Sequence, residues 1–369
     1  MRQPRLVVVG GGLSGLACAL AGARAGADVH LYESRARDAL VPGHVDIVPN
    51  MLRVLVGLGI ADACVRKGFA YRRISAIGHR GLPLYSLDVP NLAGPRYPAA
   101  LGMLRCDLYD ALSASAREAG AVLHFGTSLL DLVATGARGV SMHFSDAATT
   151  HADLVVLATG TRDRLRERIF GGSEEGAGTS EWLYLHASRA AAIDEALHAS
   201  SGTGTRAQVV PVNSTTVGVQ LALRSPELEV TPAAVRTLLA RFPGSVGALA
   251  EQIDPTQNIT RRHVRPALLT GSWALGNVMV VGDGAHAFSP HFGQSAAQAL
   301  EDAAVLGELL SQDLAPAEVA RRWYGRRLPR VRAVMDITLR AARWDEAPDI
   351  DTDLLQLTRD LDEVVRQPA

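Results

Sequence analysis

The first 33 residues contain two unbroken apolar runs, separated by a stretch with the pattern of a helix. Leu6 to Val9 is a continuous β-branched and aliphatic run, which is typical of a parallel strand buried on both faces. A helix is predicted to begin at Leu13 and Ser14. Val29 to Tyr32 then forms a second apolar run that ends at Glu33. This pattern predicts a strand, a tight turn, a helix and a second parallel strand.

Buried runs of the same kind return at residues 154–158 and 277–282, so we expect the chain to come back to the first sheet twice. Residues 71–98 and the stretch after Phe170 instead contain short strand-like runs broken by glycine and proline. We therefore predict an α/β fold with a Rossmann-type domain from residues 1–70, 99–168 and 276–345. A smaller β-sheet domain, from residues 71–98 and 169–275, interrupts it, and residues 346–369 form a C-terminal helix.

The remaining pattern predicts further elements. Helices are expected at 51–58, 104–120, 188–198, 232–242, 296–310, 316–343 and 352–366, strands at 122–125, 140–144, 207–212 and 216–223, and a loop at 41–50. Trp182, Tyr184 and His186 alternate and should share one strand face, either as a pocket wall or as ordinary core. The arginines between Arg321 and Arg330 are expected on a solvated or ion-paired surface.

The turn after the first strand has the spacing of a dinucleotide site. Gly10, Gly12 and Gly15 form G-x-G-x-x-G, whose glycines permit the tight turn, the approach of a pyrophosphate and close helix packing. The first helix offers its free N–H groups to the phosphates. Glu33 ends the second strand at the position where an acid accepts from a ribose hydroxyl, which favours FAD or NAD over NADP. We include the neighbouring Ser34 among the expected cofactor contacts.

A second signature lies at residues 282–303, GDGAHAFSPHFGQSAAQALEDA. Asp283 follows a buried strand, so it should lie at the carboxyl edge of the sheet, where ligands of doubly wound folds bind. Pro290 and Gly293 then shape a loop into a helix that begins near Ser295. The N-terminus of that helix suits the negative charge of a reduced flavin ring.

Composition limits the partners of the chain. The 369 residues carry a net charge of −1, and no apolar run reaches about 18 residues, so we expect neither a nucleic-acid nor a membrane partner. Cys18, Cys64 and Cys106 lie far apart and form no C-x-x-C, so we expect no disulfide and no metal site. A cytoplasmic protein, monomeric or homodimeric, is the simplest interpretation.

Together these motifs resemble the class A flavoprotein monooxygenases, the para-hydroxybenzoate hydroxylase family. The resemblance covers nearly the whole chain and the order of its domains. The matching positions are Gly10, Gly12, Gly15, Glu33, Arg105, Gly282, Asp283, Ala285, His286, Pro290, Gly293, Gln294, Glu301 and Asp302. Three positions depart from the family pattern: Thr159 stands where the family has the aspartate of a D-G motif, Ser295 replaces a glycine, and Gly284 replaces an alanine.

The resemblance implies non-covalent FAD, with NAD(P)H as reductant. It implies that Asp283 binds the ribityl chain and that Arg105 contacts the ribityl or pyrophosphate region. It further implies that the loop from Pro290 through Gly293, Gln294 and Ser295 to Ala296 faces the flavin ring, and that residues 43–46 line its other side. With the motif itself, the expected cofactor contacts are Gly10, Gly12, Leu13, Ser14, Gly15, Glu33, Ser34, Arg105, Asp283, Pro290, Gly293, Gln294, Ser295 and Ala296.

The function that the resemblance implies is hydroxylation of an aromatic or heteroaromatic small molecule by O₂ through a C4a-hydroperoxyflavin. Because the flavin carries that chemistry, no side chain is assigned as catalytic; His44, Asp46 and His291 are the candidates. The alternatives are a flavin oxidoreductase of the same fold that does not hydroxylate, such as a reductase or an N-oxidising enzyme, and a flavin-binding protein without turnover.

Overall fold

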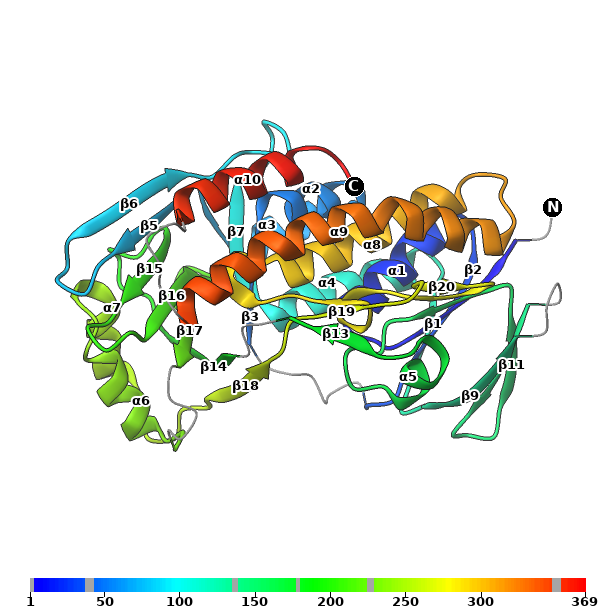
Figure 1. The fold of residues 1–369 in the computed structure, drawn as a ribbon, viewed down its shortest axis with the longest axis horizontal. Helices are drawn as coiled ribbons and strands as arrows, with labels where there is room; N and C mark the ends of the chain where they lie inside the picture. The colour runs from blue at the N-terminus through cyan, green and yellow to red at the C-terminus, as the bar shows by residue number, and fades with distance from the viewer. Residues whose placement is uncertain (1–2, 37–42, 135–138, 177–179, 224–228, 347–352) are drawn as a thin grey trace.

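The structure is a computed structural model that describes residues 3–36, 43–134, 139–176, 180–223, 229–346 and 353–369 (Figure 1). Its first sheet has the predicted parallel core. The strand order is β20 (Ala274–Leu275), β21 (Val278–Val280), β12 (Leu154–Leu157), β1 (Arg5–Val9), β2 (Asp28–Glu33) and β8 (Val122–Phe125). Only the β20–β21 pair is antiparallel. The three buried runs of the sequence, β1, β12 and β21, are therefore neighbours, as predicted.

A seven-stranded sheet combines segments that lie far apart in the chain. Its order is β18 (Thr260–Val264), β14 (Ser180–Ser188), β17 (Thr216–Leu223), β16 (Arg206–Pro211), β15 (Ala196–Ser200), β5 (Arg73–Ile77) and β6 (Pro83–Asp88). One face is apolar and packs against α6 (Pro232–Leu239) and α7 (Gly244–Ala248). Strands from both predicted segments of the smaller domain meet here, which supports the division into domains; the division itself stays a prediction.

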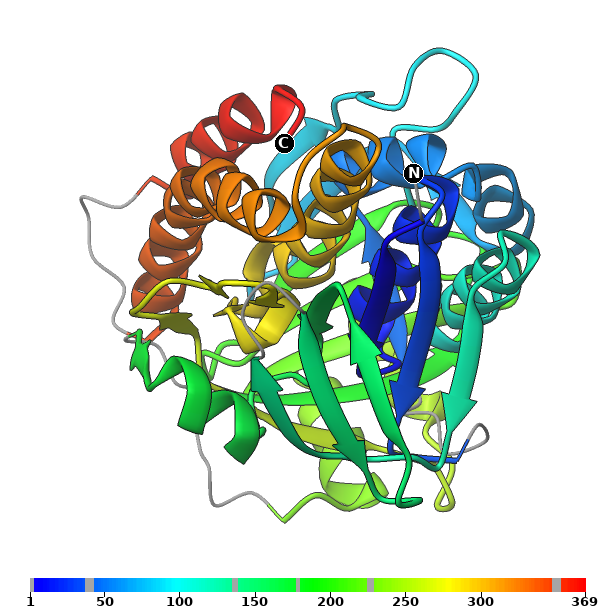
Figure 2. The same ribbon diagram turned by 90° about the vertical axis from the view of Figure 1, so that its right-hand side faces the viewer.

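Three small sheets complete the strands. They are β3 (His44–Ile47), β7 (Ala100–Leu104) and β4 (Phe69–Tyr71); β11 (Thr149–Ala152), β10 (Val140–Phe144) and β9 (Leu129–Ala134); and β13 (Ser173–Glu175), β19 (Ala267–Leu269) and β22 (His286–Ala287). The β11-β10-β9 sheet stands in front when the molecule is turned by 90° (Figure 2).

Besides α6 and α7, the described residues form eight α-helices, of which the first packs directly on the parallel sheet. They are α1 (Leu13–Arg24), α2 (Pro49–Gly57), α3 (Ala61–Lys67), α4 (Arg105–Glu118), α5 (Arg164–Phe170), α8 (Gln294–Leu310), α9 (Pro316–Glu346) and α10 (Leu354–Arg366). The first helix packs against α8 and α4, while the long helix α9 runs beside α8 (Figure 1). No helix among the described residues is long and apolar enough to cross a membrane.

Two local predictions are wrong. Residues 188–198 do not form a helix: β15 begins at Ala196 and is paired on one side with β16 and on the other with β5. The alanines that favour a helix here fit between two strands instead, so tertiary packing overrides local propensity. Residues 44–47 form β3 rather than part of a loop, because they pair with β7.

The prediction that the arginines between Arg321 and Arg330 lie on the surface of α9 is partly wrong as well. Arg321 and Arg322 do lie on the surface and pair with Glu318. Arg327, in contrast, is fully buried and contacts Asp302 at 2.7 Å and Glu301 at 3.1 Å. A charge with no exposure needs such partners, because an unpaired buried ion is strongly unfavourable. The run therefore fastens α9 to α8.

Candidate flavin and substrate site

The glycine turn has the shape that the motif requires. Gly10 has φ +107°, and a Cβ built on Gly15 would lie 1.8 Å from the carbonyl oxygen of Gly10, so the helix start sits directly on the turn. A Cβ on Gly12 would meet nothing within 4 Å, so this face of the turn is open. Gly12 also precedes α1 without a side-chain cap. The first N–H groups of α1 thus face an open surface, which suits an anion such as a pyrophosphate.

Glu33 is buried beside this turn and is already hydrogen-bonded. One carboxylate oxygen accepts from the Gly11 N–H at 2.6 Å, and the other accepts from the backbone and side chain of Arg35 at 2.9 Å. Burial raises the pKa of Glu33, but the hydrogen bonds from Arg35 and Gly11 outweigh it, so the pKa is lowered overall. The exposed Ser34 hydroxyl lies 3.3 Å from the same carboxylate. The acid is therefore ionised and fixed at the end of β2.

Arg105 lines the same cavity as the glycine turn. It begins α4, and burial lowers the pKa of its guanidinium. A cavity is shared by these elements and is lined by Gly11, Gly12, Leu13, Arg35, Arg105, Cys106 and Tyr109. The positive wall of this cavity, opposite the start of α1, matches the charge of a dinucleotide phosphate.

The second signature reaches the same place from β21. Asp283 lies in the turn after this strand, is exposed, and accepts a 2.6 Å hydrogen bond from Ser295 in the first turn of α8. A Cβ on Gly282 would lie 2.7 Å from Oγ of Ser14 in α1 and 3.6 Å from Cβ of Ala299 in α8, so both helices pack against this turn. The buried Ser14 hydroxyl has no partner among the described residues. The Ser14 hydroxyl and the Asp283 carboxylate can therefore form further hydrogen bonds, as the binding of a ribityl-pyrophosphate chain requires.

The start of α8, like that of α1, has no side-chain cap. Gly293 takes the left-handed conformation, φ +64°, and precedes α8 without a side-chain cap or an acidic residue in the first turn. A Cβ on Gly293 would lie 3.0 Å from Cγ1 of Val48 and 3.8 Å from the carbonyl oxygen of Asp46. The loop that the family resemblance places on one side of the flavin ring therefore faces the end of β3, and the resemblance places β3 residues on the other side of the ring.

The side chain of Gln294 points inward. It is 2 % exposed and hydrogen-bonds Asn50 and Gln298. Asn50 in turn donates to Glu301 at 3.0 Å. Only the backbone of Gln294 remains to face a ligand.

Buried charges support the Asp283 turn from behind. Asp302 accepts from the Gly282 N–H at 2.9 Å and contacts His286 at 2.8 Å and Arg327 at 2.7 Å. Burial raises the pKa of Asp302, but the neighbouring His286 and Arg327 lower it by more than burial raises it. The pKa of Asp302 is therefore lowered overall. Arg166 is 3 % exposed and donates to the carbonyl oxygen of Gly284 at 3.2 Å.

A cluster of polar side chains, called the polar cluster below, lies where β3 packs against the seven-stranded sheet. His44 is buried, and its Nε2 lies 3.1 Å from the amide nitrogen of Gln220, while its ring lies 5.5 Å from that of His186. Burial, with His186 and Arg262 nearby, lowers the pKa of His44 to about 3. Nδ1 of His44 and Nε2 of His186 are buried without a partner among the described residues. Such atoms are costly unless a ligand or water satisfies them.

Asp46 follows His44 on the same face of β3. It accepts a 2.5 Å hydrogen bond from the Tyr71 hydroxyl, and burial raises its pKa to about 6 despite that bond. A carboxylate in this range is suited to accept a proton near neutral pH. Asp46 is therefore the candidate with the electrostatics of a base, whereas His44 stays neutral.

His291, the third candidate, is fully engaged. Nδ1 lies 2.6 Å from Oγ of Ser289, and Nε2 lies 2.7 Å from Oδ2 of Asp345. Its ring also meets Trp182 edge-on at 5.6 Å. Both ring nitrogens of His291 already have hydrogen-bond partners, so neither is free to bind a substrate.

Tyr184 and His186 approach His44 from the same strand, so the predicted shared face of β14 is confirmed and lines the site.

Sequence reasoning missed several residues of the polar cluster. Gly218 and Gln220 on β17 touch His44, and Tyr71 on β4 holds Asp46. Their only signal is alternation along strands, which does not show which strands pair. These contacts form across sheets, between residues far apart in the chain.

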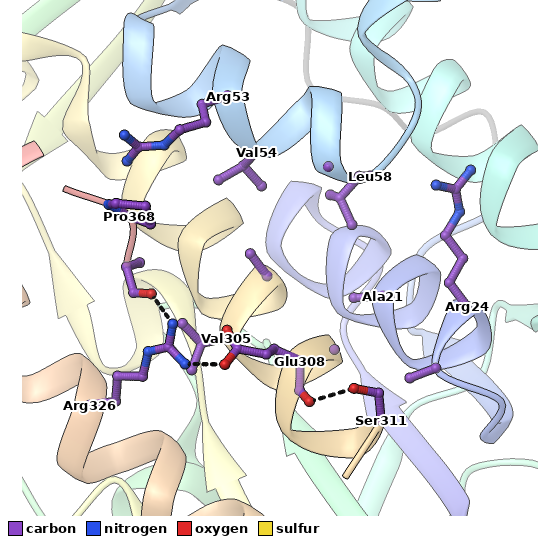
Figure 3. Close-up of a pocket in the computed structure, with 15 residues that line it drawn as sticks. Ala21, Arg24, Arg53, Val54, Leu58, Val305, Glu308, Ser311, Arg326 and Pro368 are labelled. Atoms are coloured by element: carbon purple, nitrogen blue, oxygen red, sulfur yellow. Dashed lines mark hydrogen bonds and ion pairs between the residues drawn. The ribbon is translucent and has the colours of Figure 1, made fainter. Parts of the chain in front are cut away.

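A separate cavity of about 510 Å³ lies away from this site (Figure 3). It is lined in part by Ala21 and Arg24, eight or more residues after Leu13 along α1, which is roughly 12 Å or more from the glycine turn. Arg326 on its rim contacts Glu308 and the backbone of Ala369 (Figure 3). The C-terminal segment thus forms one wall of this cavity, and the cavity is not part of the flavin site.

Comparison with known proteins agrees with this geometry. Residues 4–338 match the family model described as FAD binding domain. A 3-amino-4-hydroxybenzoate 2-monooxygenase of Streptomyces platensis is 30 % identical over 346 residues, covering 90 % of this chain and 86 % of that protein. A 6-hydroxynicotinate 3-monooxygenase of Bordetella bronchiseptica is 26 % identical over 333 residues, covering 84 % and 83 %.

Solved structures share the fold. Klebsiella pneumoniae HpxO complexed with FAD and uric acid superposes with a TM-score of 0.82 at 22 % identity, covering 98 % of this chain and 92 % of that one. A 2-methyl-3-hydroxypyridine-5-carboxylic acid oxygenase gives a TM-score of 0.83 at 20 % identity, covering 100 % and 97 %. The chain therefore belongs to the FAD binding domain family, and within it to the class A FAD-dependent monooxygenases.

Proposed function

We propose that this enzyme hydroxylates an aromatic or heteroaromatic small molecule held between its flavin and the polar inner face of the seven-stranded sheet. The observation that carries the proposal is that two uncapped helix starts, those of α1 and α8, both contact the turn after β21, in a molecule that also has a polar cluster with unpartnered buried atoms at β3. Relatives named for aminohydroxybenzoate and hydroxynicotinate support a ring that bears a hydroxyl group and a carboxylate.

The cofactor would be held by residues of both signatures. The start of α1 at Leu13 and Ser14 would bind the pyrophosphate, and Glu33 would accept from the adenosine ribose. Asp283 would accept from ribityl hydroxyls, and the backbone from Gly293 to Ala296 would face the ring. Bound FAD, reduced by NAD(P)H, supplies the activation of O₂ and the transfer of one oxygen atom to the substrate.

The side chains of the polar cluster would orient the substrate and move its proton. Nδ1 of His44 and Nε2 of His186 would hydrogen-bond polar groups of the ring. Asp46 would accept the proton of a ring hydroxyl, because its raised pKa of about 6 brings it close to the operating pH. Ionising the hydroxyl makes the ring more electron-rich and thus a better oxygen acceptor. The Tyr71 hydroxyl fixes Asp46 in place.

The test is a screen of aminohydroxybenzoates, hydroxynicotinates and hydroxyquinolines with the FAD-loaded protein. We expect at least one compound to stimulate both NAD(P)H oxidation and O₂ consumption, and its product to contain one atom of ¹⁸O from ¹⁸O₂. Stimulated oxidation that yields only hydrogen peroxide with every compound would favour a flavin oxidoreductase that does not hydroxylate. No stimulation by any compound would contradict the proposal.

A further inference from the structure

A chain of three side chains joins the end of α9 to the loop before α8. Ser289 Oγ lies 2.6 Å from Nδ1 of His291, and Nε2 of His291 lies 2.7 Å from Oδ2 of Asp345. Ser289 is fully buried, and the side chains of His291 and Asp345 are 8 % and 13 % exposed. The contact spans 54 residues of sequence, so it forms only when α9 lies against the loop.

The hydrogen bonds among Ser289, His291 and Asp345 can all form with either the neutral or the charged imidazole of His291. With a neutral imidazole, Nε2–H donates to Asp345 and the Ser289 hydroxyl donates to Nδ1. With a charged imidazole, Nδ1–H donates to Ser289, whose hydroxyl can then donate to the Thr338 carbonyl oxygen 3.5 Å away. Both ring nitrogens are used in either case. The arrangement thus suits a fixed support for the loop rather than a group that reacts with substrate.

Asp345 is itself held in place. Arg206 of β16 forms an ion pair with it, and the same guanidinium lies 4.3 Å from the centre of the Trp344 ring. On the loop side, the amide of Gln208 lies 3.5 Å from the carbonyl oxygen of His291. The turn from Pro290 to Phe292 is therefore clamped between α9 and the seven-stranded sheet, one residue before Gly293 and the start of α8.

We propose that Asp345, acting through His291, is a positioning residue for the flavin ring. By fixing the turn at Pro290–Phe292, it sets the direction of the backbone N–H groups of Gly293 and the first turn of α8. The inference rests on the proposed function, which places the flavin ring against that backbone. Asp345 itself touches neither cofactor nor substrate in this assignment.

The experiment is a double-mutant cycle read on the flavin. Asp345→Ala, His291→Ala and the double variant are compared with wild type for FAD affinity, the positions of the visible absorption bands and the reduction potential of bound FAD. We expect each single variant to lose about tenfold in affinity and to shift the bands, the effect of losing one charge-assisted hydrogen bond. The double variant should lose no more than the weaker-binding single variant, because both changes remove one contact.

Two further variants separate positioning from general destabilisation. Asp345→Asn keeps an oxygen that accepts from Nε2–H, so it should recover most of the wild-type spectrum. Glu318→Gln removes one carboxylate from the exposed face of the same helix, where it pairs with Arg321 and Arg322, and should leave the flavin unchanged. A purely structural role would lower the melting temperature of Asp345→Ala without altering the spectrum or potential of the FAD that remains bound.

The outcomes also separate this inference from the proposed function. A wild-type protein that takes up no FAD refutes the proposed function. A wild type that binds FAD, with an Asp345→Ala variant of unchanged affinity and spectrum, overturns the positioning role alone. Multiplicative losses in the double variant would likewise overturn it, because they would show that the two residues act independently.

Discussion

Replacing Asp46 by asparagine should stabilise the protein and impair its catalysis. The pKa of Asp46 is raised from 3.8 to about 6, chiefly by burial, so the folded state binds this proton more tightly than the unfolded chain does. The contribution of Asp46 to the free energy of unfolding is therefore fully present below about pH 4, and it is lost as the pH rises towards 6. At about 1.4 kcal/mol per pH unit, the loss is at most about 3 kcal/mol above pH 6. Asparagine does not ionise and still accepts from the Tyr71 hydroxyl.

Urea unfolding of wild type and Asp46→Asn at pH 4 and pH 8 measures this directly. The variant should be more stable at pH 8, by up to about 3 kcal/mol, and nearly equal at pH 4. Its hydroxylation rate should fall by about a hundredfold or more, with loss of the activity change near pH 6, because a general base is removed. Asp254→Asn is the control, since hydrogen bonds from Thr256 lower the pKa of this exposed acid and its loss brings no gain. An Asp46→Asn variant that gains no stability at pH 8 would refute the burial argument, and full activity would refute the role as base.

Other predictions concern the cofactor, the polar cluster and the replacement of the family's aspartate by Thr159. Asp283→Ala should weaken FAD binding about ten- to a hundredfold in a fluorescence titration; unchanged affinity would show that this acid does not face the flavin. Gly218→Ala would place a Cβ 2.2 Å from the His44 ring, so chemical unfolding should show a loss of about 1–3 kcal/mol, and KM for substrate should rise. Thr159 already donates to the Asp163 carboxylate at 2.5 Å, so Thr159→Asp should not speed flavin reduction by NAD(P)H in stopped flow; a faster variant would show that a carboxylate is missing there.

The sequence predicts the parallel sheet and both helix starts well, for a physical reason. Strands buried on both faces appear in the sequence as continuous apolar runs. The turns that follow them need glycine at fixed spacings, so Gly10, Gly15 and Gly293 can be recognised from the sequence alone. Asp283 and Arg105 are also placed correctly, because each stands at the end of a predicted strand or the start of a predicted helix.

The rest depends on contacts between distant segments. Alanine-rich residues 188–198 resemble a helix until β5 and β16 are known to lie on either side of Ala196 to Ser200. Arg327 resembles its exposed neighbours on α9, and only the packing of α9 on α8 shows that it is buried against Asp302. His291 resembles a substrate ligand until Asp345 is brought to its Nε2.

The central claim is that the two helix starts together form a site for one FAD. Titration of flavin-free protein with FAD, followed by flavin fluorescence and by the absorption bands near 450 nm typical of flavins, tests it most directly. The account predicts saturable, non-covalent binding of one FAD per chain, with the flavin released intact by acid. It also predicts much weaker binding by Gly12→Asp, which adds a negative side chain at the open face of the turn. A wild-type protein that remains colourless at saturating FAD, or that binds equally well with Gly12→Asp, would contradict the account.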